Sequence, residues 1–142
     1  MTVMKMGPAA IEQFLRAEFP QAFSGDDIRI ESADGRTCVL RQRYSDRMLR
    51  PGGTVSGPTL MSLADFAMYV VLLSAIGPVG LAVTTNLNIN FLRKGAPGQD
   101  LRAEARLLKL GKRLAVGEVT LLSGDSDEAI AHVTATYSIP NT

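Results

Sequence analysis

One stretch of the chain is almost free of charge, and it restricts the possible folds more than any other feature. From Pro51 to Leu92, Asp65 is the only residue with a formal charge. The uncharged run 66–83 approaches the length of a membrane-spanning helix, but Gly77-Pro78 and Gly80 interrupt it. The pattern predicts a buried core helix followed by a turn and a strand, rather than a membrane span.

The segment GPTLMSLADFAMYVVLLSAIGP carries the signals of a helix with defined ends. Ser56 or Gly57 can cap its N-terminus, and Pro58 suits the first turn, where a backbone N–H has no partner to lose. Gly77-Pro78 stops the helix about twenty residues later. Nearly every side of this helix is apolar, so we expect a sheet that curls around it and a second subunit that covers more of it.

The remaining segments favour antiparallel strands preceded by one short helix. Pro8 and the helical spacing of apolar residues predict an amphipathic helix over 8–19. Asp34-Gly35, between two alternating runs, predicts a hairpin. Residues 45–57 are predicted to be a loop without regular structure. Alternating segments predict a strand over 82–93 and three more before residue 140, so the order is that of an α+β fold with an antiparallel sheet against one helix.

Length and composition exclude several classes of protein. The 142 residues fit one domain over 1–142. Fifteen basic and fourteen acidic residues give a net charge of +1 without runs of like charge, so neither nucleic acid nor a membrane surface is an expected partner. A single cysteine and a single histidine argue against a disulfide framework and the usual metal clusters. No secretory signal is evident at the start, so we expect a cytoplasmic protein. From the same shortage of cysteine and histidine, we expect no bound metal.

Four polar residues form a stripe on the apolar helix. Thr59, Ser62, Asp65 and Tyr69 are spaced by three, three and four residues, which places them on one side. The hydroxyls can form a structural network with the preceding turn. Asp65 has no basic residue three or four positions away, so it can serve as a general base for water or attack a carbonyl directly. A catalytic role and a structural role both stay open for this carboxylate.

The start of the same helix offers a second chemical group. The first backbone N–H groups of a helix lack intrahelical partners and lie at the positive end of its dipole. Gly57 is the best donor there for an oxyanion, because Pro58 has no N–H and Gly57 has no side chain to obstruct a ligand. The alternative is that Gly57-Pro58 is simply a favourable helix start.

The chain resembles the hotdog-fold acyl-CoA thioesterases of the PaaI-like and 4-hydroxybenzoyl-CoA thioesterase type. The resemblance rests on the order and spacing of SGP at 56–58, LAD at 63–65, VTTNLNINFLR at 83–93, GKR at 111–113 and VTATYSIP at 133–140. It covers about 28–140. It implies a curved antiparallel sheet wrapped around one long central helix, in a homodimer or dimer of dimers with active sites at the subunit interfaces.

The resemblance also implies roles for particular residues. The helix acid, which matches Asp65, acts as base or nucleophile, and the glycine N–H that matches Gly57 polarises the thioester carbonyl. A hydroxyl on the next strand assists, and Thr84 and Thr85 both stand at about that position. The expected reaction is hydrolysis of a small or medium, aliphatic or aromatic acyl-CoA to the free acid and coenzyme A, with no cofactor other than the coenzyme A of the substrate.

Two positions depart from the family pattern, and they leave other functions open. Ser56 stands where the family has a histidine, and Arg50 where it often has an asparagine. The absence of this histidine and asparagine favours altered or lost catalysis. A non-catalytic acyl-CoA binder is therefore the main alternative function, and a purely structural oligomer is another. A dehydratase is disfavoured because it needs a histidine beside the acid. Arg50 could instead hold a carboxylate or phosphate.

The resemblance suggests further residues for the substrate. Basic residues near the cleft rim suit the phosphates of coenzyme A, and apolar residues of the helix suit the acyl group. The alternative for the basic residues is that they are solvated surface charges, and the alternative for the apolar residues is that they pack in the core. The predicted substrate-binding residues are Arg50, Ser56, Met61, Ser62, Met68, Tyr69, Arg93, Lys94, Lys112 and Arg113.

Two residues with reactive side chains are predicted to lie outside the site. His132 alternates with Thr134 and Thr136 and is therefore expected on the polar face of the last strand. Cys38 lies between two strand residues and is expected to be a small packing residue rather than a nucleophile.

Overall fold

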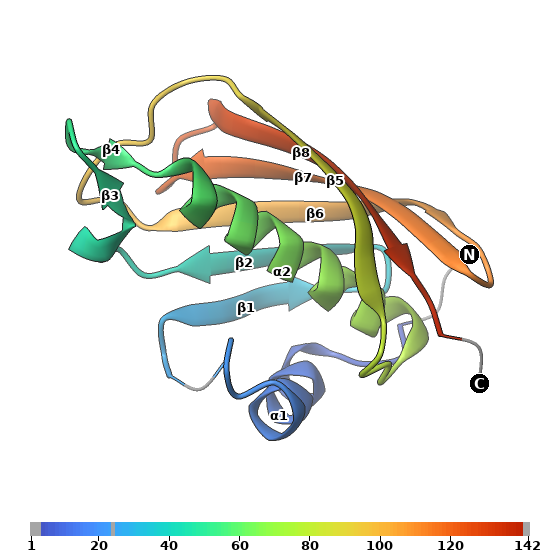
Figure 1. Ribbon diagram of the computed structural model, residues 1–142. Coiled ribbons are helices and arrows are strands. Elements are labelled where there is room, and N and C mark those ends of the chain that lie inside the picture. Colours follow the sequence, from blue (N-terminus) through green and yellow to red (C-terminus); the bar gives the residue numbers. More distant parts are fainter. Residues whose placement is uncertain (1–3, 24, 141–142) are drawn as a thin grey trace.

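A computed structural model describes residues 4–23 and 25–140, and it shows a curved antiparallel sheet wrapped around one long helix (Figure 1). The sheet has six strands in the order β1-β2-β6-β7-β8-β5. The elements are α1 (Pro8–Glu18), β1 (Ile28–Ala33), β2 (Thr37–Gln42), the 3-10 turn η1 (Asp46–Met48), β3 (Leu49–Arg50), β4 (Thr54–Val55), α2 (Gly57–Ile76), β5 (Val83–Phe91), β6 (Leu101–Leu110), β7 (Leu114–Ser123) and β8 (Ala129–Ser138). The predicted α+β hotdog arrangement, with its short N-terminal helix, is confirmed.

Helix α2 begins and ends at the predicted signals. The Ser56 side chain caps the helix by accepting a hydrogen bond from the backbone N–H of Thr59, at 3.3 Å. Gly77 ends it with a φ of 90°, a conformation that suits glycine. In the described part of the chain, α2 is the one helix long and apolar enough to cross a membrane. Most of it is buried inside the sheet, which identifies it as the core helix.

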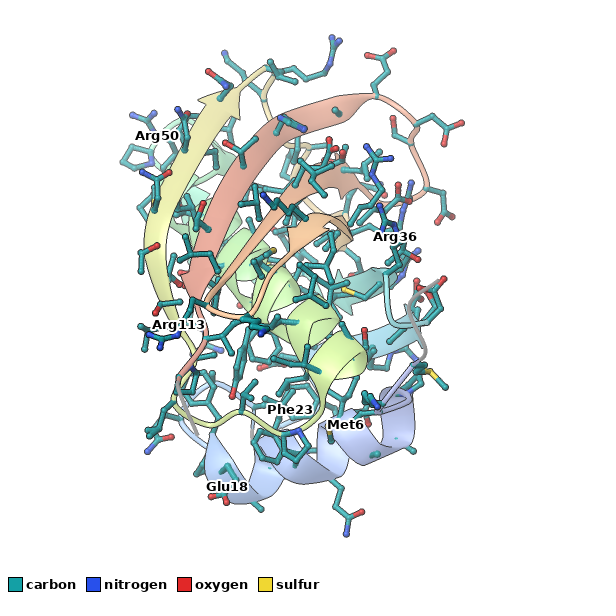
Figure 2. The ribbon with its side chains drawn as sticks, turned by 90° about the vertical axis from the view of Figure 1, so that its right-hand side faces the viewer. Met6, Glu18, Phe23, Arg36, Arg50 and Arg113 are labelled. Carbon is teal, nitrogen blue, oxygen red and sulfur yellow. The ribbon has the colours of Figure 1, made fainter. Side chains whose placement is uncertain are left out.

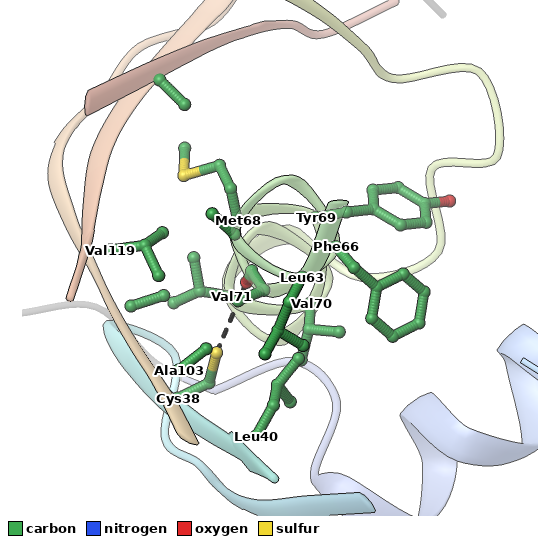
Figure 3. Close-up of a cluster of buried hydrophobic side chains, with 14 of the residues drawn as sticks. Cys38, Leu40, Leu63, Phe66, Met68, Tyr69, Val70, Val71, Ala103 and Val119 are labelled. Carbon is green, nitrogen blue, oxygen red and sulfur yellow. Dashed lines mark hydrogen bonds between the residues drawn. The ribbon is translucent and has the colours of Figure 1, made fainter. Parts of the chain in front are cut away.

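The side of α2 that faces the strands forms the core (Figure 3). Met68 points toward the sheet, where it packs against Gly117 of β7. Cys38 of β2 is also buried, and its Sγ donates a hydrogen bond to the backbone oxygen of Ala67 at 3.4 Å. Burial raises the pKa of the Cys38 thiol to about 12. The prediction that Cys38 is a packing residue is confirmed.

The segment before α2 is more regular than predicted. Instead of a loop without regular structure, it contains η1 and the short hairpin β3–β4, in which Leu49 pairs with Val55 and Arg50 with Thr54. The prediction was wrong because Gly52 and Gly53 do more than interrupt the chain. Their positive φ angles, 103° and 81°, form the turn that joins the two strands.

The two edges of the sheet differ in how they are covered. At the β1 edge, α1 packs alongside, and a Glu12 carboxylate oxygen accepts a hydrogen bond from the backbone N–H of Ile30 at 3.3 Å. At the other edge, β5 pairs with β8 on one side and with no other strand of the described residues. Along β5, Leu87 and Ile89 are half-buried and the three asparagines are exposed, as the alternation predicts. The end residues Val83 and Phe91 are each 55% exposed.

Candidate active site

Asp65 lies in the middle of α2, half-buried, with its carboxylate held by two hydroxyl groups. Thr84 Oγ1 donates a hydrogen bond to Oδ1 of Asp65 at 2.6 Å. The Tyr137 hydroxyl lies 3.0 Å from the same Oδ1 and 3.0 Å from the backbone oxygen of Asp65. None of the ion pairs among the described residues includes Asp65. Its carboxylate is therefore oriented by neutral donors and not neutralised by a cation, which leaves it able to accept a proton.

The structure distinguishes between the two threonines that the sequence left open. Thr84 contacts the carboxylate, whereas Thr85 Oγ1 donates to the backbone oxygen of Thr136 at 3.2 Å. The register of β5 against β8 shifts between Thr84 and Asn86. This irregularity allows the two adjacent hydroxyls to serve different partners.

Tyr137 is a site residue that the sequence analysis missed. It lies on the apolar side of β8 and is buried, and burial is the main reason why the pKa of its phenol lies above the ordinary value. Its ring stacks on that of Tyr69, with centroids 6.1 Å apart and an interplanar angle of 11°. The sequence did contain a signal for Tyr137, namely a tyrosine on the apolar face of a predicted strand. A buried tyrosine usually forms a hydrogen bond through its hydroxyl.

The predicted polar stripe of α2 faces one cavity of about 550 Å³. Thr59, Ser62, Asp65 and Tyr69 all line it, so the predicted grouping on one side is confirmed. The other lining residues are mostly apolar and include several aromatic rings: Phe19, Ala22, Ile28, Gln42, Pro58, Leu63, Phe66 and Tyr137. A second cavity of about 290 Å³ reaches Asp65 from the side of Thr84 and Glu18. Asp65 thus stands where two cavities meet.

The two methionines predicted to line the acyl pocket lie elsewhere. Met68 is fully buried on the sheet side of α2, while Phe66 and Tyr69 extend away from the sheet (Figure 3). The assignment of Met68 to the pocket is corrected accordingly, because it stands one position before Tyr69 and therefore faces another side of the helix. Met61 is 41% exposed and is absent from the lining of both cavities at Asp65.

The start of α2 lies in a different cleft, of about 410 Å³, with basic residues on its rim. Three of the predicted basic residues, Arg50, Arg93 and Lys94, line this cleft together with Gly57. Arg93 also pairs with Glu128 at 3.2 Å. A methyl group on Gly57 would lie 3.0 Å from Cζ of Phe91, so a larger residue here would require the Phe91 ring to shift by a few tenths of an ångström.

Gly57 and Asp65 are not brought together within one chain. Asp65 follows Gly57 by eight positions along α2, which corresponds to about 12 Å of helix. They line different cavities. Ser56, between Gly57 and the preceding strand, uses its hydroxyl to cap α2 and does not reach Asp65.

Lys112, Arg113 and His132 do not line either cavity at Asp65. Lys112 and Arg113 are exposed on the turn between β6 and β7, away from Arg50 (Figure 2). His132 lies on the outer side of β8, as predicted, and its Nε2 is 2.9 Å from a carboxylate oxygen of Glu118. It does not contribute to the Asp65 site.

Comparison with known proteins identifies the family of this chain. A sequence model of the thioesterase superfamily matches residues 52–130. The crystal structure of a candidate thioesterase from Silicibacter sp. TM1040 is similar, with 39% identity, coverage of 99% of this chain and 96% of that one, and a TM-score of 0.89. A candidate esterase of Pseudomonas aeruginosa is 28% identical over 105 residues, which are 74% of this chain and 77% of the relative.

A more distant structure has the same fold. It is a hypothetical thioesterase of Streptococcus pneumoniae, determined with coenzyme A, with 20% identity, a TM-score of 0.74, and coverage of 82% of this chain and 91% of that one. The protein described above belongs to the thioesterase superfamily. This membership supports hydrolysis of acyl thioesters as the general chemistry of the site.

Proposed function

We propose that this protein hydrolyses acyl-CoA thioesters to the free acid and coenzyme A, with Asp65 as the general base. The observation that carries the proposal is the Asp65 carboxylate, which two hydroxyls orient at the junction of two cavities and which no cation among the described residues neutralises. Such a carboxylate can take a proton from a water molecule as the water attacks the thioester carbonyl. The reaction then needs neither a metal nor a separate cofactor.

The larger cavity suits the acyl group. Its volume of about 550 Å³ and its lining of Phe19, Phe66 and the Tyr69–Tyr137 pair match a small or medium acyl chain, aliphatic or aromatic. The Asp65 carboxylate, which lines the cavity, would lie beside the carbonyl carbon of such a chain.

A second copy of the chain would complete the site. Strand β5 is nine residues long, lacks charge and proline, and has one edge that no other strand of the described residues pairs with. These are the features of a strand that pairs with another chain. Asp65 contacts the start of β5 through Thr84, and Gly57 contacts its end at Phe91. Antiparallel pairing of β5 with β5 of a two-fold related copy brings these opposite ends together.

In this pairing, the partner subunit would supply the hydrogen-bond donor for the oxyanion. The partner subunit's Gly57 would point its free N–H toward the carbonyl oxygen that Asp65-activated water attacks, where a backbone donor stabilises the developing negative charge. Collapse of the tetrahedral intermediate breaks the C–S bond, and the proton held by Asp65 passes to the departing thiolate. The carboxylate is regenerated and the acid is released.

The same pairing gathers the basic residues. Lys112 and Arg113 follow β6 at the Val83 end of β5, because Val83 and Leu114 both pair with Ser138. They would therefore face the cleft of the partner subunit that holds Arg50, Arg93 and Lys94. A rim of this charge suits the phosphates of coenzyme A, the molecule held by the Streptococcus pneumoniae relative.

The test is release of free thiol from a panel of aliphatic and aromatic acyl-CoAs by the wild type and Asp65→Asn. We expect hydrolysis by the wild type and a loss of about a hundredfold or more in kcat for the variant, because the base is removed. Asp127→Asn, which removes an exposed carboxylate in the β7–β8 turn, is the matched control and should retain activity. Equal activity of wild type and Asp65→Asn would contradict the proposal.

The replacements at Arg50 and Ser56 favour a second candidate, an acyl-CoA binder without turnover. The basic cleft and the aromatic cavity would remain useful to such a protein. It predicts that acyl-CoA raises the melting temperature while no thiol is released, and that result would replace the enzyme by the binder.

A further inference from the structure

The two oxygens of the Asp65 carboxylate have different surroundings. Oδ1 has Thr84 Oγ1 at 2.6 Å and the Tyr137 hydroxyl at 3.0 Å. Oδ2 has no hydrogen-bond donor among the described residues. Because Oδ1 already accepts from two hydroxyls, its lone pairs are less available than those of Oδ2. The site therefore presents one oxygen of the carboxylate for chemistry and holds the other.

The Tyr137 hydroxyl is a hydrogen-bond donor that its surroundings hold in one position. Its side chain is only 4% exposed, and its ring stacks on Tyr69, which is itself anchored by a hydrogen bond from its hydroxyl to the backbone oxygen of Val79 at 3.2 Å. Burial raises the pKa of the Tyr137 phenol, so the hydroxyl keeps its proton throughout the pH range in which a carboxylate base works. The hydroxyl has one proton, which Oδ1 and the backbone oxygen of Asp65 share as acceptors, each 3.0 Å away. The hydroxyl is thereby held against both the carboxylate and the helix.

We propose that Tyr137 is a positioning residue for the hydrolysis, which together with Thr84 occupies Oδ1 of Asp65 and directs Oδ2 at the attacking water. The inference rests on the proposed function of Asp65 as general base. Tyr137 does not touch the reacting atoms in this account. It acts by fixing the rotation of the carboxylate, since a small misplacement of a catalytic group lowers the rate of the chemical step.

The test uses Tyr137→Phe, which keeps the ring and its stack on Tyr69 and removes only the hydroxyl. We expect kcat to fall about tenfold while KM stays within about twofold, because the carboxylate gains freedom but the acyl cavity keeps its shape. The melting temperature should change little. Tyr44→Phe is the matched control, because it removes a tyrosine hydrogen bond to Asp46, 2.7 Å long, away from both cavities at Asp65.

A double-variant cycle with Thr84→Val separates positioning from general support of the fold. Each single variant leaves one donor on Oδ1, whereas the double variant leaves none, so the loss in kcat of the double variant should exceed the product of the two single losses. Thr84→Ser keeps a hydroxyl and should retain most of the activity. Losses in kcat that simply multiply would contradict a shared function at Oδ1.

The wild type and Asp65→Asn in the same assay distinguish failure of this inference from failure of the proposed function. If Asp65→Asn is inactive and Tyr137→Phe keeps the wild-type kcat, the positioning role is wrong and the thioesterase stands. A lower melting temperature of Tyr137→Phe without a change in kcat likewise overturns the inference, because it shows a structural role only. A wild type that releases no thiol overturns both.

Discussion

Asp65 illustrates how a single carboxylate is maintained in an apolar stretch of sequence. Its hydrogen-bond donors come from positions 19 and 72 residues further along the chain, and both are neutral hydroxyls. The sequence indicated that the acid is important, because no basic residue stands near it on the helix. The family resemblance limited one donor to Thr84 or Thr85, but nothing in the sequence indicated that Tyr137 contacts Asp65, because it reaches Asp65 only through the pairing of β5 and β8. The choice of Thr84 over Thr85 depends on an irregular register that strand alternation does not reveal.

Cys38 provides a test at the residue scale. Burial raises the pKa of its thiol to about 12, so the reactive thiolate is nearly absent at pH 8. We expect the folded protein to resist a thiol-directed reagent such as iodoacetamide at that pH, and the protein unfolded in guanidinium chloride to react fully. Mass spectrometry of the intact chain measures the modification. Rapid labelling of the folded protein would show that the β2–α2 packing opens readily.

At the scale of elements, the sequence predicted what long periodic segments determine. The bounds of α2 follow from Ser56, Pro58 and Gly77, and the later strands follow from alternation. The hairpin β3–β4 escaped prediction because strands of two residues have no detectable period. Met68 was misplaced for a related reason: a helix that is apolar all round does not reveal which side faces a cavity.

The N-terminus of α2 provides a test of the proposed oxyanion donor. Gly57→Pro removes the backbone N–H at the first position of the helix, where no intrahelical partner is lost and the fixed φ of proline suits the helix. Its ring also requires Phe91 to shift slightly. We expect kcat to fall by about 10²–10³, the usual effect of losing an oxyanion donor, with little change in the melting temperature.

Gly57→Ala is the control for the added bulk. It keeps the N–H, and its methyl group meets the exposed ring of Phe91, which can move. Its loss in kcat, measured by the same thiol-release assay, should be much smaller than that of the proline variant. Similar losses for the two variants would show that space around Phe91 matters and the N–H does not.

In the whole molecule, the features that suggest a second copy differ from those that the sequence offers. The sequence suggested a partner because α2 is apolar on nearly every side. In the structure, the chain's own sheet and α1 bury most of that helix. A second copy is suggested instead by the edge of β5 that pairs with no further strand of the described residues and by the separation of Gly57 from Asp65. The unpaired edge depends on strand order, which local sequence patterns do not specify, whereas the separation follows from the positions of the two residues along α2.

The most direct test of a site shared between two copies is complementation between inactive chains. Asp65→Asn and Gly57→Pro chains, co-expressed with different tags and purified as mixed dimers, would contain one site with both native groups and one site with neither. We predict that each variant alone is nearly inactive and that the mixed dimer releases thiol from acyl-CoA at about half the wild-type rate. A mixed dimer as inactive as its parents would contradict the shared site and the proposed roles of Asp65 and Gly57.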